Sequence, residues 1–155
     1  MKTNYHTHST FCDGKNTLEE MILTAIEKDF QILGFSSHSM YPFATDWHLP
    51  VEKHEEYVKS LRELKDKYKD QIDVQIGFEA DFIQGLCFPD FESYKNFNPD
   101  FLIGSVHFVP GKNGFFEADG NIETVKKEIK NSFNGNIKKA VQEYFYLERE
   151  MLKKA

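Results

Sequence analysis

Two histidines near the start of the chain, His6 and His8, have a spacing that suits metal binding. Residues two apart in an extended strand point to the same face, about 6.6 Å apart along the chain, so both imidazoles can reach one ion while Thr7 points away. Asp13 follows after a short loop and can bring a carboxylate oxygen beside them. A mixed nitrogen and oxygen site suits Zn, Fe or Mn better than Ca or Mg. An H-x-H pair alone is explained equally well by polar residues at a solvated strand end.

Three later segments supply the same kinds of side chain. Each is a short run of apolar residues that reads as a strand, and the residues at or just beyond their ends are His38, Glu79 and His107. Taken singly, each is more often a structural side chain than a ligand. Together with His6 and His8, however, they follow four successive predicted strands, and chance would scatter them over helices and loops as well. We therefore expect these five side chains to lie at one end of four mainly parallel strands, near residues 3–7, 32–37, 73–79 and 101–107.

Helical patterns alternate with these strands. Thr17 to Glu20 has the spacing of a capping box before an apolar periodic run, and residues 51–69 also read as a helix. One short helix is predicted within residues 84–99. The Pro-Gly and Asn-Gly turn signals predict a hairpin over residues 106–118. Two final helices are predicted over residues 121–132 and 136–154. Strands that alternate with helices indicate an α/β fold with a parallel sheet, in which functional groups gather at the carboxyl ends of the strands.

The spacing of apolar and charged residues predicts whether several further side chains are buried or exposed. The apolar faces expected to point inward in the last two helices are formed by Ile122, Val125 and Ile129, and by Ile137, Val141, Tyr144 and Phe145. His54 lies on a charged helix, which predicts a solvated side chain. His48 lies in the aromatic loop 39–50, which carries Tyr41, Pro42, Phe43 and Trp47 and can wall a pocket.

Composition narrows the class of protein. The 155 residues, 40% hydrophobic with 15 Phe and 7 Tyr, predict one compact domain with no internal boundary. A net charge of −6 without a basic run argues against nucleic acid as a partner. Cys12 and Cys87 are too few for a disulfide framework and indicate a reducing compartment. No apolar segment has the length of a signal sequence core or a membrane span, so we expect a cytoplasmic protein without a membrane partner.

Four segments resemble the polymerase-and-histidinol-phosphatase (PHP) family of metal-dependent hydrolases, and within it the bacterial histidinol-phosphatases. The segments are Tyr5-His6-Thr7-His8-Ser9-Thr10-Phe11-Cys12-Asp13-Gly14, Gly34-Phe35-Ser36-Ser37-His38, Gly77-Phe78-Glu79-Ala80-Asp81 and Ile103-Gly104-Ser105-Val106-His107. They occur in the family's order, and the resemblance covers essentially the whole chain.

The resemblance implies a distorted (β/α) barrel with a trinuclear site for divalent Zn, Fe or Mn. His6, His8 and Glu79 would hold one ion, Glu79 would bridge to a second ion bound by His107, and Asp13 with His38 would serve a third. Glu79, His107 and Asp13 would thereby be the catalytic ligands. His48 and Asp81 are candidates for substrate binding, and Asp81 is alternatively a residue that orients a ligand.

Two further stretches of the family pattern, one with a His and one with an Asp-x-His, do not occur in the 155 residues. A complete (β/α) barrel needs 200 or more residues. We therefore expect residues 1–155 to form a single PHP domain that corresponds to about the first four β/α units. Because an open sheet leaves unpaired strand edges, we also expect self-association or a second polypeptide that completes the barrel.

The implied activity is metal-dependent hydrolysis of a small phosphate monoester, with L-histidinol phosphate of histidine biosynthesis as the expected substrate. Water activated by two cations would attack phosphorus, so no side-chain nucleophile is needed. The alternatives are a truncated, catalytically impaired metal-binding chain, and another PHP activity that acts on phosphotyrosine, nucleotides or nucleic acid.

Overall fold

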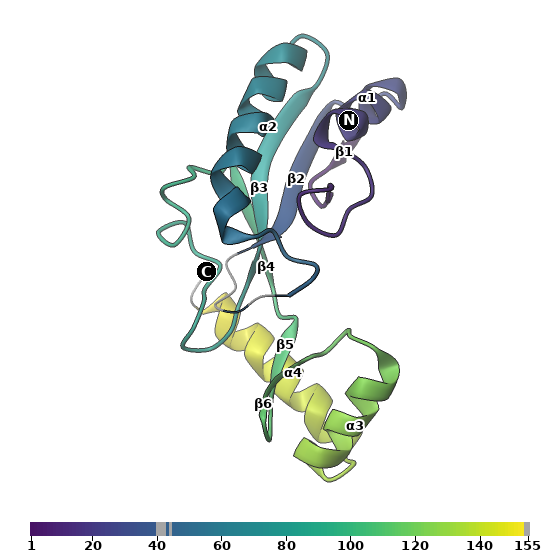
Figure 1. The fold of residues 1–155 in the computed structure, drawn as a ribbon, viewed down its shortest axis with the longest axis vertical. Coiled ribbons are helices and arrows are strands. Elements are labelled where there is room, and N and C mark those ends of the chain that lie inside the picture. The colour runs from purple at the N-terminus through teal and green to yellow at the C-terminus, as the bar shows by residue number, and fades with distance from the viewer. Residues whose placement is uncertain (40–42, 44, 154–155) are drawn as a thin grey trace. The chain divides into compact units, whose positions relative to one another are not determined.

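The computed structural model describes residues 1–39, 43 and 45–153. The predicted contributions of Tyr41 and Pro42 to the aromatic loop therefore lie outside the described residues. The chain divides into two compact units, one formed by Met1–Ala80 and Asp90–Ile103 and the other by Asp81–Pro89 and Gly104–Ala155. Figure 1 shows the elements of both units.

The main sheet has the strand order β1-β2-β3-β4, formed by β1 (Thr3–Asn4), β2 (Ile32–Ser39), β3 (Asp73–Asp81) and β4 (Phe101–Ser105). The pairs β1/β2 and β2/β3 are parallel, as predicted. β1 is shorter than predicted because the Asn4 side chain accepts a hydrogen bond from the backbone N–H of His6. Beyond it, Thr7 still follows β2, since its carbonyl accepts from Ser36 N and its hydroxyl donates to Gly34 O.

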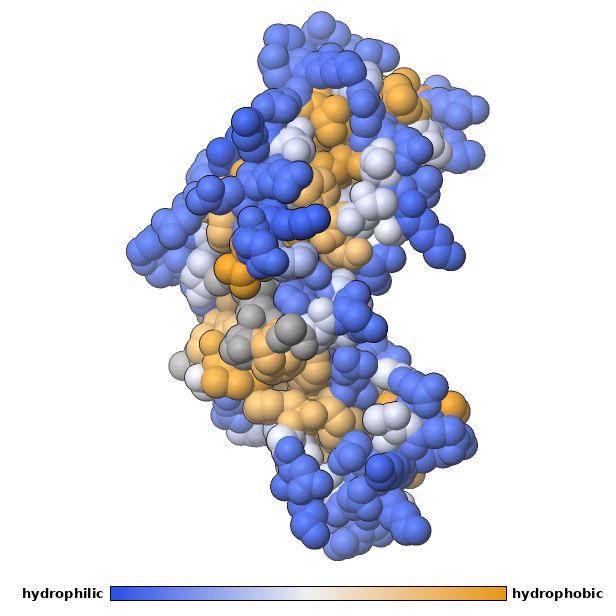
Figure 2. Space-filling model, in the orientation of Figure 1, coloured by the Kyte–Doolittle hydropathy of each residue, from blue (hydrophilic) through white to orange (hydrophobic). Residues whose placement is uncertain are grey.

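Helices α1 (Leu18–Glu27) and α2 (His54–Tyr68) bury their apolar faces in the core of the first unit. α1 begins with the predicted capping box between Thr17 and Glu20. The fully buried side chains shared by helices and strands include Ile22, Phe35, Tyr57, Leu61, Val74 and Phe78. Figure 2 shows hydrophilic residues over the outward side of α2 and hydrophobic residues between α2 and α1.

Glycine is required where β4 approaches β2 and β3. A Cβ atom on Gly77 would lie 2.5 Å from the Phe101 ring, and one on Gly34 would lie 2.9 Å from it. The two glycines therefore leave the space that this ring fills, and the ring also packs edge-on against Tyr5 at a centroid distance of 5.2 Å. This packing holds the segment that leads to His6.

Two predictions for the first unit and the following loop are wrong, and a third, the helix at 51–69, is confirmed except for its first turn. The segment 51–69 begins as a short 3-10 turn, η1 (Val51–Lys53), before α2. Residues 84–99 form turns and an isolated bridge between Ile83 and Cys87 rather than a helix. His54 is 1% exposed rather than solvated, because its ring stacks on Phe97 and packs near Phe78 in the core.

The second unit contains the predicted hairpin, β5 (Phe108–Gly111) paired antiparallel with β6 (Gly114–Glu117), and two helices, α3 (Ile122–Phe133) and α4 (Ile137–Leu152). Asn121 and Asn136 cap the two helices. The core of this unit is formed by Phe82, Val106, Val109, Phe116, Leu147 and Met151. No helix in the described part of the chain is long and apolar enough to cross a membrane.

The predicted inward faces of α3 and α4 are largely wrong. Ile122 and Ile137 are each 64% exposed, Phe145 is 56% exposed and Val141 is 47% exposed. α4 buries Ala140, Leu147 and Met151 instead. The helix carries two apolar stripes, and the 3.6-residue period cannot tell which of them faces the core. Figure 2 accordingly shows hydrophobic residues at the surface of this unit next to hydrophilic ones.

Candidate metal centre

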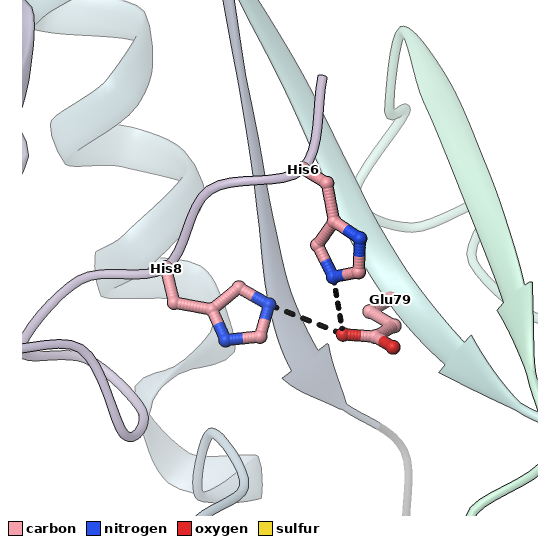
Figure 3. A group of neighbouring side chains, drawn as sticks. All are labelled: His6, His8 and Glu79. Carbon is pink, nitrogen blue, oxygen red and sulfur yellow. Dashed lines mark hydrogen bonds and ion pairs between the residues drawn. The ribbon is translucent and has the colours of Figure 1, made fainter. Parts of the chain in front are cut away.

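The Glu79 carboxylate is the centre of a histidine cluster in the first unit. Its side chain is only 5% exposed, and Oε2 lies 2.9 Å from His6 Nε2, 3.1 Å from His8 Nε2 and 3.2 Å from His38 Nδ1. His38 and Glu79 are register partners on the parallel strands β2 and β3, so both side chains leave the sheet on the same side. His6 and His8 reach the same oxygen from the irregular segment after β1, as Figure 3 shows.

Asp13 joins this cluster from the loop that follows His8. Its Oδ1 lies 2.8 Å from His8 Nδ1 and its Oδ2 lies 3.8 Å from His38 Nε2. The loop returns because Ser9 O accepts from the backbone N–H groups of Cys12 and Gly14. A Cβ at Gly14 would lie 2.5 Å from Ser9 N, so this close return needs glycine. The structure thus brings together five of the predicted ligands within one unit.

The charges of the cluster act on one another. Burial lowers the pKa of His8, but the Glu79 and Asp13 carboxylates beside its ring outweigh that effect and leave its pKa above the ordinary value. For Asp13, burial raises the pKa, and the neighbouring His8 and His38 more than offset it, so its pKa lies below the ordinary value. The imidazole and carboxylate groups of the cluster therefore stabilise one another's charged forms.

The geometry of His6, His8 and Glu79 fits a divalent cation. Ligand atoms that bind one ion at about 2.1 Å lie about 3.0–3.4 Å apart, depending on the coordination geometry. The two nitrogen-to-Oε2 distances of 2.9 and 3.1 Å are close to that range, and the ligand atoms of the three residues lie within 4.8 Å of one another. His8 Nε2 is buried without a hydrogen bond despite its distance of 3.1 Å from Oε2. This close approach of His8 Nε2 and Glu79 Oε2 is expected when both atoms point at the position of one metal ion.

A second group of ligand atoms, from His8, Asp13 and His38, also lies within 4.8 Å. His8 belongs to both groups, and its Nδ1 is already hydrogen-bonded to Asp13. A histidine that binds metal through Nε2 commonly has its other nitrogen held by a carboxylate. Asp13 is therefore placed to orient His8, a contact that its spacing in the sequence did not specify.

Trp47, a residue of the predicted aromatic loop, is a neighbour of the cluster. The sequence did not predict this contact. Its ring packs edge-on against His38 at a centroid distance of 4.7 Å. It is the one tryptophan of the chain, which makes its fluorescence a reporter for changes at His38.

His48, the candidate for substrate binding, accepts at Nδ1 from Thr45 N (3.1 Å) and from the Thr45 hydroxyl (2.7 Å), and burial lowers its pKa.

His107 and Asp81 lie in the second unit, where they form a pair. Asp81 Oδ1 accepts from the backbone N–H of His107 at 2.9 Å, and Asp81 Oδ2 lies 2.9 Å from His107 Nδ1. Burial raises the pKa of Asp81, and the hydrogen bonds from His107 act in the opposite direction. The predicted role of His107 beside Glu79 stays a prediction, and so does a role for Asp81 in substrate binding.

The chain matches one family model and three curated proteins. The PHP domain family model matches residues 4–150. A probable histidinol-phosphatase of Schizosaccharomyces pombe is 34% identical over an alignment of 123 positions, which covers 70% of this chain and 40% of that protein. The chain spans between 40% and 57% of the length of the curated relatives that it matches.

Two solved structures resemble the fold. A putative histidinol phosphatase of Listeria monocytogenes is 26% identical with a TM-score of 0.72, over 86% of this chain and 56% of that one. The histidinol phosphate phosphatase of Lactococcus lactis, solved with zinc, L-histidinol and phosphate, is 26% identical with a TM-score of 0.53, over 68% of this chain and 40% of that one. The four-stranded sheet thus corresponds to part of a PHP-type (β/α) barrel.

Proposed function

This chain belongs to the PHP domain family, and from that premise we propose that it is a metal-dependent phosphomonoesterase that converts L-histidinol phosphate and water to L-histidinol and phosphate. The observation that carries the proposal is the convergence of His6, His8 and Glu79 on one position at the end of the sheet. The relatives named as histidinol-phosphatases support the choice of substrate.

The residues of the site divide into those that would bind the metal ion and those that would orient its ligands. His6, His8 and Glu79 would hold a divalent cation, with Zn favoured by the Lactococcus lactis relative and Fe and Mn as alternatives that suit the same donors. Asp13 would hold His8 through Nδ1, and His38 beside Glu79 would add a further nitrogen. Bound cations at such a site polarise phosphoryl oxygens and lower the pKa of water. The trinuclear arrangement, with His107 as a ligand of the second ion, belongs to the proposal.

The deciding experiment is an assay of phosphate release by chelator-treated chain reloaded separately with Zn²⁺, Mn²⁺ and Fe²⁺. We expect release from L-histidinol phosphate, and none from the His8→Ala variant under the same conditions. Hydrolysis of phosphotyrosine or of nucleoside monophosphates in preference to L-histidinol phosphate would contradict the proposed substrate while leaving the reaction class in place.

A second candidate is a metal-binding chain without catalysis of its own. It is favoured by the share of the relatives' length that the chain covers, 40–57%. In that case zinc binds at His6, His8 and Glu79 but no phosphate is released with any metal. Elemental analysis of the chain used in the assay separates this outcome from a failure to bind metal.

We also propose a cytoplasmic location and self-association or pairing with a second polypeptide. The free thiols of Cys12 and Cys87 support the location. The exposed apolar side chains of α4, Ile137, Val141 and Phe145, support the association. Light scattering that shows a monomer at high protein concentration would count against association of the chain with itself.

A further inference from the structure

Asp81 is the acidic side chain that the proposed reaction does not yet use. Its side chain is 0% exposed, and its two oxygens face two different donors of the same residue, the backbone N–H and the ring Nδ1 of His107, each at 2.9 Å. A buried carboxylate is costly unless its oxygens are bonded, so this contact is an integral part of the fold of the second unit.

The backbone of His107 is held on both sides. His107 lies two residues beyond β4 and directly before β5, where the chain leaves the sheet. Its N–H donates to Asp81 and its carbonyl accepts from Ala118 N at 2.8 Å. The neighbouring backbone is also held, since Phe82 N, next to Asp81, donates to the carbonyl of Ser105, the last residue of β4, at 2.8 Å. The ring of His107 therefore extends from a fixed backbone.

Two contacts agree on where the ring carries its proton. A carboxylate oxygen that faces Nδ1 favours the tautomer with hydrogen on Nδ1. At the other edge of the ring, the Ser105 hydroxyl lies 3.3 Å from Nε2 and is placed to donate to it. Ser105 and His107 both line a cavity of about 510 Å³ in the second unit, so this end of the unit has room for a ligand.

We propose that Asp81 is a positioning residue that holds the His107 ring and keeps its Nε2 free of a proton, ready to bind a cation. This inference rests on the proposed role of His107 as a metal ligand. It gives Asp81 a different task from contact with the substrate, because both of its oxygens are directed at His107 inside the unit. Loss of a carboxylate that orients a metal-binding histidine typically weakens metal affinity about 10- to 100-fold.

The first test reads the tautomer directly in the wild-type chain. Long-range proton–nitrogen NMR spectra of the chelator-treated protein at neutral pH, with His107 identified from a His107→Gln sample, should show the proton on Nδ1. A proton on Nε2 in the wild-type chain would overturn the inference, and this measurement needs no substitution at Asp81. It is independent of activity, so a chain that shows the Nδ1 tautomer but releases no phosphate removes only the proposed function.

The second test uses Asp81→Asn, which keeps the shape of the side chain. Its amide can donate to Nδ1 and drive the proton to Nε2, the effect that the same exchange has in a Ser-His-Asp triad. We expect the affinity for the second, more weakly held zinc ion, the one that His107 would bind, to fall about 10- to 100-fold in titration calorimetry. Glu123→Gln replaces an exposed acidic residue of the same unit that does not line this cavity; it is the matched control and should stay within about twofold of wild type.

A double variant separates positioning from a general structural role. If Asp81 acts through His107, Asp81→Asn should weaken zinc binding little or not at all in a His107→Gln background. An equally large loss in both backgrounds would overturn the inference, and so would a His107→Gln chain that binds all of its zinc ions, the second included, as tightly as wild type.

Discussion

The two units differ in how completely they bury their apolar side chains. In the first unit, β2 and β3 are buried along nearly their whole length, and α1 and α2 close over them. In the second unit, α3 buries none of its residues and α4 buries only Ala140, Leu147 and Met151. The difference shows that a strand covered on both faces leaves no choice of inward side, whereas a helix with two apolar stripes does.

The sharpest test of this difference is the same substitution made in both units. Phe78 is fully buried in the first unit and packs against the rings of Tyr57, Tyr94 and Phe97. Truncation to alanine should lower the free energy of unfolding by about 3–5 kcal/mol. Phe145→Ala in the second unit, where the ring is 56% exposed, should change it by less than about 0.5 kcal/mol at protein concentrations low enough to keep the chain monomeric.

Urea unfolding followed by circular dichroism measures both variants. Similar losses for Phe78→Ala and Phe145→Ala would show that the α4 face is covered in solution, by a second copy of the chain or by another polypeptide. Repeating the measurement across a range of protein concentrations distinguishes the first case, because self-association makes stability depend on concentration.

Much of the first unit could be predicted because its signals are local and one-sided. The capping box at Thr17 and the buried strand that carries His38 allow few alternatives. The convergence of His6, His8, His38 and Glu79 followed from strand ends in a parallel sheet, although His6 and His8 reach it from an irregular segment rather than from a strand. What failed depended on tertiary contacts. The burial of His54 requires Phe97, which is distant in sequence.

The next prediction concerns which histidine matters most for metal binding. His8 belongs to both ligand groups of the first unit. One group contains His6 and Glu79, and the other contains Asp13 and His38. His8→Ala should therefore weaken zinc binding at least about 100-fold, more than the loss of an orienting group alone. His38→Ala should have a much smaller effect, because the three ligand atoms of His6, His8 and Glu79 remain.

Zinc titrations followed by Trp47 fluorescence suit this comparison, since Trp47 packs against His38. Calorimetry on the same variants provides a reading that does not depend on that contact. Equal losses of affinity in His8→Ala and His38→Ala would show that the ranking of the two groups is wrong. Two or three tightly held zinc ions per isolated chain would do the same, because we expect one tightly held ion at His6, His8 and Glu79 and weaker binding at the other positions of the proposed trinuclear site.

The smallest expected effect comes from His54, a polar side chain inside the better packed unit. Its Nδ1 donates to Val51 O at 2.9 Å, and its Nε2 is buried without a hydrogen bond. Burial lowers the pKa of His54, with His48 and Glu52 as the nearest charged or titratable influences. The folded state therefore resists a proton that the unfolded state accepts once the pH falls below about 6.5.

The sign of the effect follows from that difference. The free energy of unfolding should be highest above pH 6.5 and should fall as the pH drops from there towards the lowered pKa of the folded state, by at most about 1.4 kcal/mol per pH unit for this one group. His54→Asn can keep a donor to Val51 O but cannot titrate, so it should be less stable yet lose less stability between pH 7.5 and pH 5.5. Urea unfolding of chelator-treated wild type, His54→Asn and the exposed-site control Glu63→Gln of the same helix at several pH values isolates this contribution. An identical dependence on pH in wild type and His54→Asn would mean that His54 becomes charged without leaving the aromatic core, and the contrast in burial between the units would then not extend to their polar side chains.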